Sequence, residues 1–119
     1  MENEKIYIAG PVTGYDLNER HNYFFQIFEE IDRLTRPQPI NPMDLGIPKN
    51  ATHEHAMSVC LPQLCECDAI LLLPGWGKSR GSQFELTVAR EIDLKVYKLG
   101  TTGGLWYNDE QVGQIEMPK

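Results

Sequence analysis

The stretch Leu71–Glu85, LLLPGWGKSRGSQFE, decides the fold of this chain. Its apolar beginning predicts a buried strand, and the glycine-rich segment that follows predicts a turn. A helix is then expected to begin at Ser82, with Glu85 in its first turn. Ligands of open α/β sheets bind outside the carboxyl ends of the strands. This turn is therefore the first candidate for a functional site.

The rest of the chain repeats the alternation of strand, turn and helix. The expected strands are 5–9, 38–40 (an edge strand with two flanking prolines), 68–73 and 95–99, with a last strand or an interface at 105–107. The expected helices are one capped by Asp16 or Asn18 and running to Leu34, one over 52–64, and one over 82–92 that buries Phe84, Val88 and Ile92. This order predicts a small doubly wound α/β domain, Rossmann-like or flavodoxin-like. Its sheet is expected to be mainly parallel, with four to five strands and helices on both faces.

Composition limits the classes of protein to which the chain can belong. Its 119 residues fit one domain, 1–119, with a core over about 5–99 and a tail over 100–119. A net charge of −6 without a basic cluster argues against a nucleic-acid polymer as partner. No apolar run approaches the roughly 20 residues that span a bilayer, so no membrane partner is expected. The charged N-terminus is no signal peptide, and the cysteines Cys60, Cys65 and Cys67 are best interpreted as reduced thiols of a cytoplasmic protein.

Two segments resemble known ligand-binding motifs but lack the residue spacing that those motifs require. Gly77-Lys78-Ser79 resembles the end of a phosphate-binding P-loop, but that loop needs a glycine five residues earlier, where Leu72 stands. His53 and His55 are two residues apart, whereas a helical zinc pair needs a spacing of four. The cysteines also lack paired CxxC spacing. No metal and no cofactor are expected.

Glu85 has two interpretations on the sequence alone. With Ser82 it forms a capping box, in which the serine bonds forward and the glutamate bonds back. Alternatively, it is a carboxylate nucleophile at the mouth of the sheet. Ser79 and the amides that follow it suit a phosphate at a helix N-terminus, or simply a helix cap. A second glycine-bracketed turn, 10–14, follows the first strand and is expected to frame the same cleft.

Several motifs in order resemble a known superfamily over about residues 5–99. They are Ile8–Gly14, Asn18, Asn41-Pro42, Cys67-Asp68, Leu73–Trp76, Ser79–Gly81, Glu85 and Ala89. The chain resembles the nucleoside 2-deoxyribosyltransferases and the related deoxynucleoside-monophosphate N-glycosidases, in a small branch common in bacteriophages. The resemblance implies cleavage of an N-glycosidic bond or transfer of a deoxyribosyl group by double displacement.

The resemblance also implies roles for individual residues. Glu85 matches the nucleophile that attacks C1′ of the sugar, and Tyr7 matches a tyrosine that orients it. Ser79 matches a serine that helps hold a 5′-phosphate in the monophosphate hydrolases. The implied substrate contacts are Gly10, Pro11, Gly14, Asn18, Asn41, Gly75, Trp76, Ser79 and Gly81. The partner would be a small nucleoside or nucleotide. Because relatives complete their sites with a neighbouring subunit, a homo-oligomer is expected, with Leu105–Tyr107 as the contact patch.

One position departs from the pattern. Relatives place an aspartate that handles the departing base where this chain has Cys60. A thiol is a poor proton donor at the pKa that such chemistry needs. Either another acid such as Glu54 or Asp44 replaces it, or the chain turns over slowly. A third possibility is that it binds, and so sequesters, a nucleotide without cleaving it.

Overall fold

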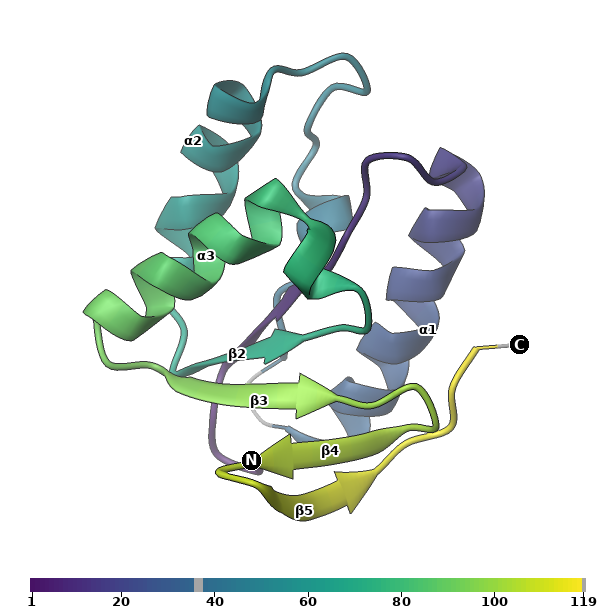
Figure 1. Cartoon of the computed structure of the whole chain (residues 1–119), viewed down its shortest axis with the longest axis vertical. Coiled ribbons are helices and arrows are strands. Elements are labelled where there is room, and N and C mark those ends of the chain that lie inside the picture. The colour runs from purple at the N-terminus through teal and green to yellow at the C-terminus, as the bar shows by residue number, and fades with distance from the viewer. Residues whose placement is uncertain (36–37, 119) are drawn as a thin grey trace.

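The computed structural model describes residues 1–35 and 38–118, and in this part of the chain a five-stranded sheet packs against three α-helices (Figure 1). The strands are β1 (Ile6–Ala9), β2 (Ala69–Leu72), β3 (Lys95–Leu99), β4 (Gly104–Tyr107) and β5 (Glu110–Gln114). The helices are α1 (Leu17–Leu34), α2 (His53–Cys65) and α3 (Arg80–Glu91), with short 3-10 turns η1 (Pro42–Asp44) and η2 (Trp76–Lys78). The α/β class is as predicted.

The sheet is mixed rather than mainly parallel. Its strand order is β1-β2-β3-β4-β5, in which β1, β2 and β3 pair in parallel and β3, β4 and β5 pair antiparallel. Helical crossovers separate the parallel strands, whereas only residues 100–103 join β3 to β4, which is too short for a crossover. The sequence did not predict β5, which is polar. Its signal was the turn Asn108-Asp109, where both residues have positive φ, as a two-residue hairpin requires.

The edge strand expected at 38–40 is reduced to one bridge among the described residues. Ile40 pairs in parallel with Tyr7, and residue 37 lies outside the described part of the chain. The Ile8 amide donates to the Ile40 carbonyl at 3.0 Å, and the Ile40 amide donates to the Ile6 carbonyl at 2.8 Å. Pro39 has no amide hydrogen to continue the ladder.

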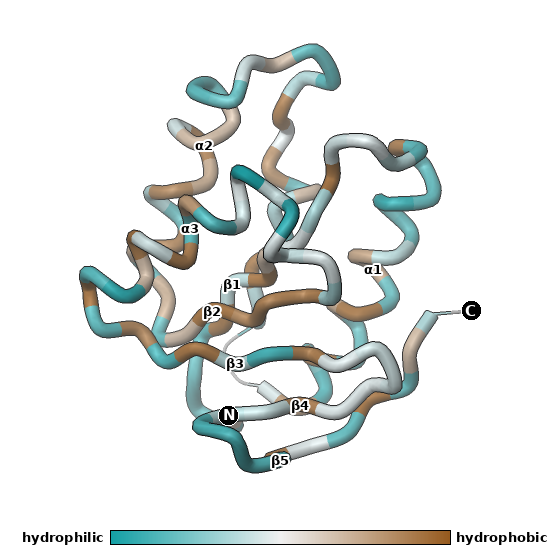
Figure 2. The backbone as a smooth tube through the Cα atoms, in the orientation of Figure 1, coloured by the Kyte–Doolittle hydropathy of each residue, from teal (hydrophilic) through white to brown (hydrophobic). Residues whose placement is uncertain are grey.

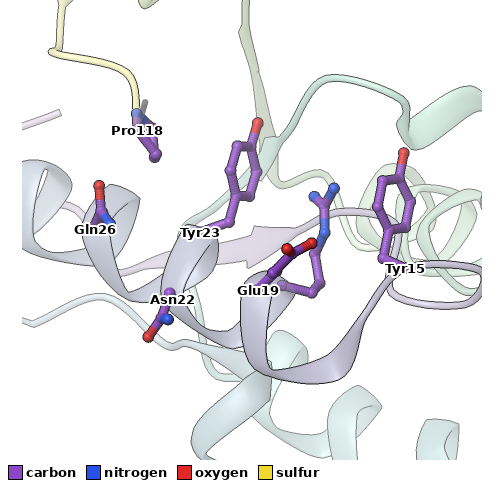
Figure 3. Close-up of a pocket in the computed structure, with 7 residues that line it drawn as sticks. Tyr15, Glu19, Asn22, Tyr23, Gln26 and Pro118 are labelled. Atoms are coloured by element: carbon purple, nitrogen blue, oxygen red, sulfur yellow. The ribbon is translucent and has the colours of Figure 1, made fainter.

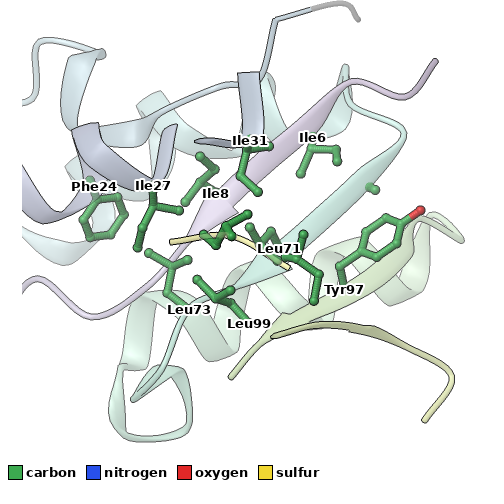
Figure 4. Packing of buried hydrophobic residues seen from close by; sticks show 12 residues of the cluster. Ile6, Ile8, Phe24, Ile27, Ile31, Leu71, Leu73, Tyr97 and Leu99 are labelled. Carbon is green, nitrogen blue, oxygen red and sulfur yellow. The ribbon is translucent and has the colours of Figure 1, made fainter. Parts of the chain in front are cut away.

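Alternate residues of the parallel strands feed two separate cores. On one face, α1 covers an apolar cluster that includes the following side chains: Ile6, Ile8, Phe24, Ile27, Ile31, Leu71 and Leu73 (Figure 4). On the other face, α2 and α3 cover a second cluster: Tyr7, Ala9, Cys60, Leu64, Ile70, Leu72, Leu86 and Ala89. Figure 2 shows hydrophobic residues concentrated along β2, between the two helical layers. The strands are therefore buried on both faces, as their unbroken apolarity predicted.

Helix α3 corrects two predictions. It begins at Arg80 with Ser79 as its N-cap, rather than at Ser82. Its buried face consists of Ser82, Glu85, Leu86 and Ala89. Phe84 is 47% exposed and Ile92 is 43% exposed, so these two of the three residues predicted to be buried face outward, whereas Val88 is half-buried against the second cluster. The small Ala89 and the polar contact of Glu85 allow this other face to lie close to the sheet.

The other two helices begin where the sequence indicated. Asp16 caps α1 by accepting from the Glu19 amide, and Thr52 caps α2 by accepting from the His55 amide. No helix in the described ranges is long and apolar enough to cross a membrane.

The segment expected as a last strand or an interface is strand β4. Leu105 is fully buried in the core, and Tyr107 packs on Tyr97 with ring centroids 5.2 Å apart. Trp106 alone of the three is strongly exposed, at 41%. In the segment predicted for subunit contact, only the Trp106 indole is therefore strongly exposed.

Candidate functional site

The centre of the site is a buried tyrosine–glutamate pair. Tyr7 lies on β1, and Glu85 lies on the inner face of α3, 78 residues later. The Tyr7 hydroxyl donates a hydrogen bond to Oε2 of Glu85. Tyr7 is fully buried and Glu85 is 5% exposed. The contact expected from the resemblance is thus present.

Burial controls the ionisation of this pair. It raises the pKa of Glu85 to about 7, even though the hydrogen bond from Tyr7 lowers it. No cation within the described ranges forms an ion pair with this carboxylate. Burial, and then the charge of Glu85, raise the pKa of Tyr7 well above its usual value, so Tyr7 stays protonated as a donor. Near neutral pH the carboxyl of Glu85 is balanced between its two forms, which is a common property of catalytic groups.

Cys60 is the third member of this buried cluster. It lies on α2 among the residues that pack around Tyr7, and it is 3% exposed. Burial raises the pKa of Cys60, its interaction with the Tyr7 hydroxyl lowers it, and the charge of Glu85 raises it further. The side chain therefore remains a neutral thiol at physiological pH. The departure from the superfamily pattern falls inside the site.

The two acids considered as substitutes for the missing aspartate lie elsewhere. Glu54 is exposed and lies 4.0 Å from Arg80, and Asp44 is exposed beside His21 at 3.2 Å. Both side chains are mostly exposed to solvent, and neither forms a hydrogen bond with Glu85 or Tyr7 in the described part of the chain.

The capping-box interpretation of Glu85 is wrong. Ser79 caps α3, since its Oγ accepts from the Ser82 amide at 3.2 Å. Glu85 instead turns toward the sheet and Tyr7. The hydroxyl of Ser82 is buried and has no hydrogen-bond partner in the described part of the chain. Ser82 and Glu85, which are three positions apart, are thus both buried polar residues on one face of α3. The sequence did not predict the burial of Ser82.

The two glycine turns lie side by side, as expected. A Cβ on Gly10 would stand 2.9 Å from the Leu73 Cβ, so only glycine permits this close approach of the first turn to the end of β2. Gly75 has φ +87°, and a Cβ there would lie 3.2 Å from Pro11 and 3.7 Å from the Tyr15 hydroxyl. The turns after β1 and β2 therefore touch at the same end of the sheet (Figure 1).

The other predicted contacts are spread over several elements. Gly14 and Asn18 are exposed on the loop and first turn of α1, and a Cβ on Gly14 would meet nothing within 4 Å. Asn41 is buried, but its side chain caps η1 by accepting from the Met43 amide at 3.0 Å. Gly81 packs against Met57 of α2. Trp76 is half-buried in η2, with the Lys98 ammonium 5.8 Å from its ring.

The histidines and cysteines that were rejected as metal ligands on their spacing have other surroundings. The His53 ring packs edge-on to Phe84 with centroids 6.0 Å apart, and all three cysteines are free thiols. Within the described ranges, no group of three or more His, Cys, Asp or Glu side chains is placed to hold a metal ion.

A groove of about 550 Å³ lies along α1, and sequence reasoning did not find it (Figure 3). Arg20 lines it, with its guanidinium carbon 3.7 Å from the ring centroid of Tyr15 and 4.4 Å from that of Tyr23. A signal was present, because Arg20 continues the buried stripe of Phe24, Ile27 and Ile31 by one turn. An arginine in such a stripe needs an explanation.

Fold and site together define a mixed α/β domain with a buried tyrosine–glutamate pair under the helix that follows its second parallel strand. The chain belongs to the family DUF4406, a domain of unknown function, whose model matches residues 4–98. The match begins just before β1 and ends within β3, so the β4–β5 hairpin lies outside it. No curated protein and no solved structure matches the chain.

Proposed function

We propose that this protein cleaves the N-glycosidic bond of a nucleoside or nucleotide, with Glu85 as the nucleophile. One observation carries the proposal: Glu85 is buried, and its carboxylate faces Tyr7 instead of capping its own helix. Oε1 accepts no hydrogen bond from the described residues, so it is the oxygen available for attack. A carboxylate that is withdrawn from water and held by one donor is a suitable nucleophile.

The reaction proceeds by two displacements at one carbon. Glu85 Oε1 attacks C1′, and the C1′–N bond breaks with its electron pair leaving on the base, which takes up a proton from solvent. Water or an N–H nitrogen of a second base then attacks C1′ from the opposite side and gives up its proton to solvent. The C1′–O bond breaks, and the Glu85 carboxylate is restored. Configuration at C1′ is retained, as in retaining glycosidases with a carboxylate nucleophile.

Tyr7 positions the nucleophile and favours its ionised form. Its hydroxyl donates to Oε2, which fixes the carboxylate and lowers the pKa of Glu85 against the effect of burial. With a pKa of about 7, the reactive carboxylate form increases as pH rises through neutrality. We therefore expect the first displacement to be faster at pH 8 than at pH 6.

The surroundings suit a small phosphorylated ligand. In a doubly wound, Rossmann-like arrangement, the touching turns after β1 and β2 form the binding edge of the sheet. The first amides of α3 and the Ser79 hydroxyl, which can donate while it caps, suit a 5′-phosphate. A homo-oligomer in the cytoplasm remains part of the proposal, and sedimentation of the purified chain tests the oligomer.

The test is release of free base. The purified chain is incubated with a panel of nucleosides and deoxynucleoside monophosphates, with and without a second base, and the products are separated by chromatography. Glu85→Gln should reduce base release by about 1,000-fold or more. Glu4→Gln is the matched control, because Glu4 also accepts from a tyrosine but belongs to the other face. Full activity of Glu85→Gln would contradict the proposal.

A second candidate is a protein that binds a nucleotide without cleaving it. The observation in its favour is the neutral Cys60 thiol in the buried cluster, which cannot serve as an acid for a leaving base. It predicts saturable binding of one panel member by calorimetry, with no base released over hours. Base release that disappears in Glu85→Gln decides against it.

A further inference from the structure

Arg20 is a buried cation without an acidic partner. It is 9% exposed, and its Nη1 is buried with no hydrogen-bond partner among residues 1–35 and 38–118. No described carboxylate lies within 4.0 Å of it. Burying a charge without a counter-ion is costly, and buried arginines are nearly always paired. In a chain with 17 acidic residues, this isolation is not for lack of carboxylates.

Two tyrosines hold the guanidinium in place. Tyr15 and Tyr23 stack against it at 3.7 and 4.4 Å from their ring centroids. Stacking satisfies the faces of a guanidinium, but its N–H donors lie in its plane and point to the edge. The tyrosines therefore fix the orientation of Arg20 and leave donors for a planar or tetrahedral oxyanion.

An open groove lies beside Arg20. Its volume of about 550 Å³ falls in the range of ligand pockets. Asn22 and Gln26 add amide groups to the same wall, and Figure 3 shows Tyr15 and Tyr23 rising on the same side of α1. Glu19, the acidic residue of the lining, is exposed to solvent and makes no ion pair with Arg20.

Tyr15 connects this groove to the edge of the sheet. Its hydroxyl lies 3.7 Å from the position of a Cβ on Gly75, in the turn that precedes α3. Tyr15 is also half exposed and belongs to the loop between β1 and α1. It therefore lies between the groove and the turn before α3, outside the apolar core.

We infer that Arg20 is an anion-recognition residue, which binds the phosphate group of a small ligand in the groove along α1. A guanidinium matches phosphate with two parallel N–H donors, and its desolvated position strengthens the contact. The phosphate belongs to the nucleotide of the proposed function or to a separate phosphorylated ligand. The inference itself does not depend on cleavage at Glu85.

Pyrophosphate is the probe for the site itself. Binding to the full chain is measured by calorimetry and by the shift of the Arg20 side-chain resonance. Arg20→Gln should weaken pyrophosphate binding at least about tenfold, the loss of one charge-assisted contact. Arg33→Gln is the control on the same helix. Arg33 is 73% exposed and is paired with Glu30 at 2.7 Å, and its change should alter affinity less than twofold.

Two further variants keep the test decisive if Arg20→Gln fails to fold. Arg20→Lys retains the charge but loses the planar fork, and it should weaken binding by an intermediate factor. Tyr15→Ala removes one of the two rings that orient the guanidinium and should weaken pyrophosphate binding. Equal pyrophosphate affinity in wild type and Arg20→Lys, or no saturable binding to wild type at 100 mM salt, would overturn the inference.

Kinetics separate the two sources of phosphate. If the substrate carries it, Arg20→Gln raises KM for a nucleoside monophosphate but not for the matching nucleoside. If a separate ligand carries it, pyrophosphate binding is lost while both KM values stay unchanged. Glu85→Gln should bind pyrophosphate as wild type does, so failure of the cleavage proposal remains distinct from failure of this one.

Discussion

Tyr7 and Tyr97 each donate a hydrogen bond to a glutamate, but the two pairs lie on opposite faces of the sheet. Tyr7 bonds to Glu85 in the core under α2 and α3, and Tyr97 bonds to Glu4 on the α1 side. Burial raises the pKa of Glu85 to about 7. It also raises the pKa of Glu4, but the bonds from Lys95, Tyr97 and the N-terminal ammonium outweigh it and lower the value to about 2.

The difference shows that a tyrosine donor alone does not set the ionisation of a carboxyl group. Glu4 has two cations within 3.1 Å, Lys95 and the N-terminus, and it fastens the start of the chain to β3. Glu85 has the hydroxyl of Tyr7 and no cation in the described part of the chain. The first pair is a structural link with a permanently ionised carboxylate. The second holds its carboxyl group near its titration point, where it can react.

The largest expected effect is on the pH dependence of stability at Glu85. Its folded pKa of about 7 exceeds the ordinary glutamate value of 4.5, so the group favours the folded state only while protonated. As pH rises from 4.5 through 7, this contribution is lost, which corresponds to about 3 kcal/mol. Glu85→Gln cannot ionise and should not show this loss. Urea denaturation at pH 5 and pH 8 measures it, and parallel profiles for wild type and variant would contradict it.

The next effect concerns the donor. Tyr7→Phe removes the hydrogen bond that lowers the pKa of Glu85, so the pKa should rise above 7 by about one unit, or about 1.4 kcal/mol. If Glu85 is the nucleophile, base release at pH 7 should fall about fivefold and its rise should shift to higher pH. The pH–rate profile and the carboxyl carbon resonance of Glu85 measure the two outcomes. Tyr97→Phe is the matched control, and it should leave both unchanged.

Glu4 should show the opposite pH dependence, with a smaller amplitude. Its folded pKa of about 2 lies below 4.5, so its contribution is present above pH 4.5 and is lost as pH falls toward 2. Because its partner Lys95 is half exposed, solvent screening limits the amount to about 1 kcal/mol. Glu4→Gln should destabilise the protein at pH 6 and converge with wild type near pH 2. A variant of unchanged stability at pH 6 would refute this.

Added salt should also distinguish the Glu4 pair from the Glu85 pair, and this is the smallest of the expected effects. The ion pair of Glu4 with the exposed Lys95 is screened at high ionic strength, since the Debye length falls to about 3 Å at 1 M. The pKa of Glu4 should rise by a few tenths of a unit, roughly the scale of an exposed ion pair. The pKa of Glu85, which has no cation partner in the described ranges, should not move. Carboxyl carbon titrations at 0.05 and 1 M NaCl test both values, and equal shifts would count against the distinction.

Sequence reasoning found the parallel half of the molecule almost completely. The strands that became β1, β2 and β3 were predicted from short apolar runs ended by turns. Helices α1 and α2 were predicted from their apolar spacing, with Asp16 as one of two candidate caps for α1. These signals are local, since each depends on neighbours within a few residues. The hairpin of β4 and β5 was half missed, because β5 is polar and pairs only with β4.

The sequence pointed to Glu85 and Tyr7, and the structure brings these two side chains into contact. The sequence did not predict the direction in which individual side chains point. Ser82 and Glu85 fit a capping box by spacing, but the cap moved to Ser79 and the glutamate turned inward. Asn41 was predicted to bind substrate, yet its side chain caps η1. The direction of a side chain depends on the approach of distant elements, which spacing along one helix does not encode.

By itself, the sequence determined the α/β class, the three strands of the parallel half and the two turns at one edge of the sheet. The period of the hydrophobic residues and the turn-forming residues act over short distances along the chain, so the sequence alone predicts these elements. Only the tertiary structure decided that Tyr7 meets Glu85 across 78 residues, that Cys60 joins them, and that Arg20 is buried without an acid. Ionisation and hydrogen bonding depend on burial and on partners brought from distant segments, and these exist only once the chain has packed.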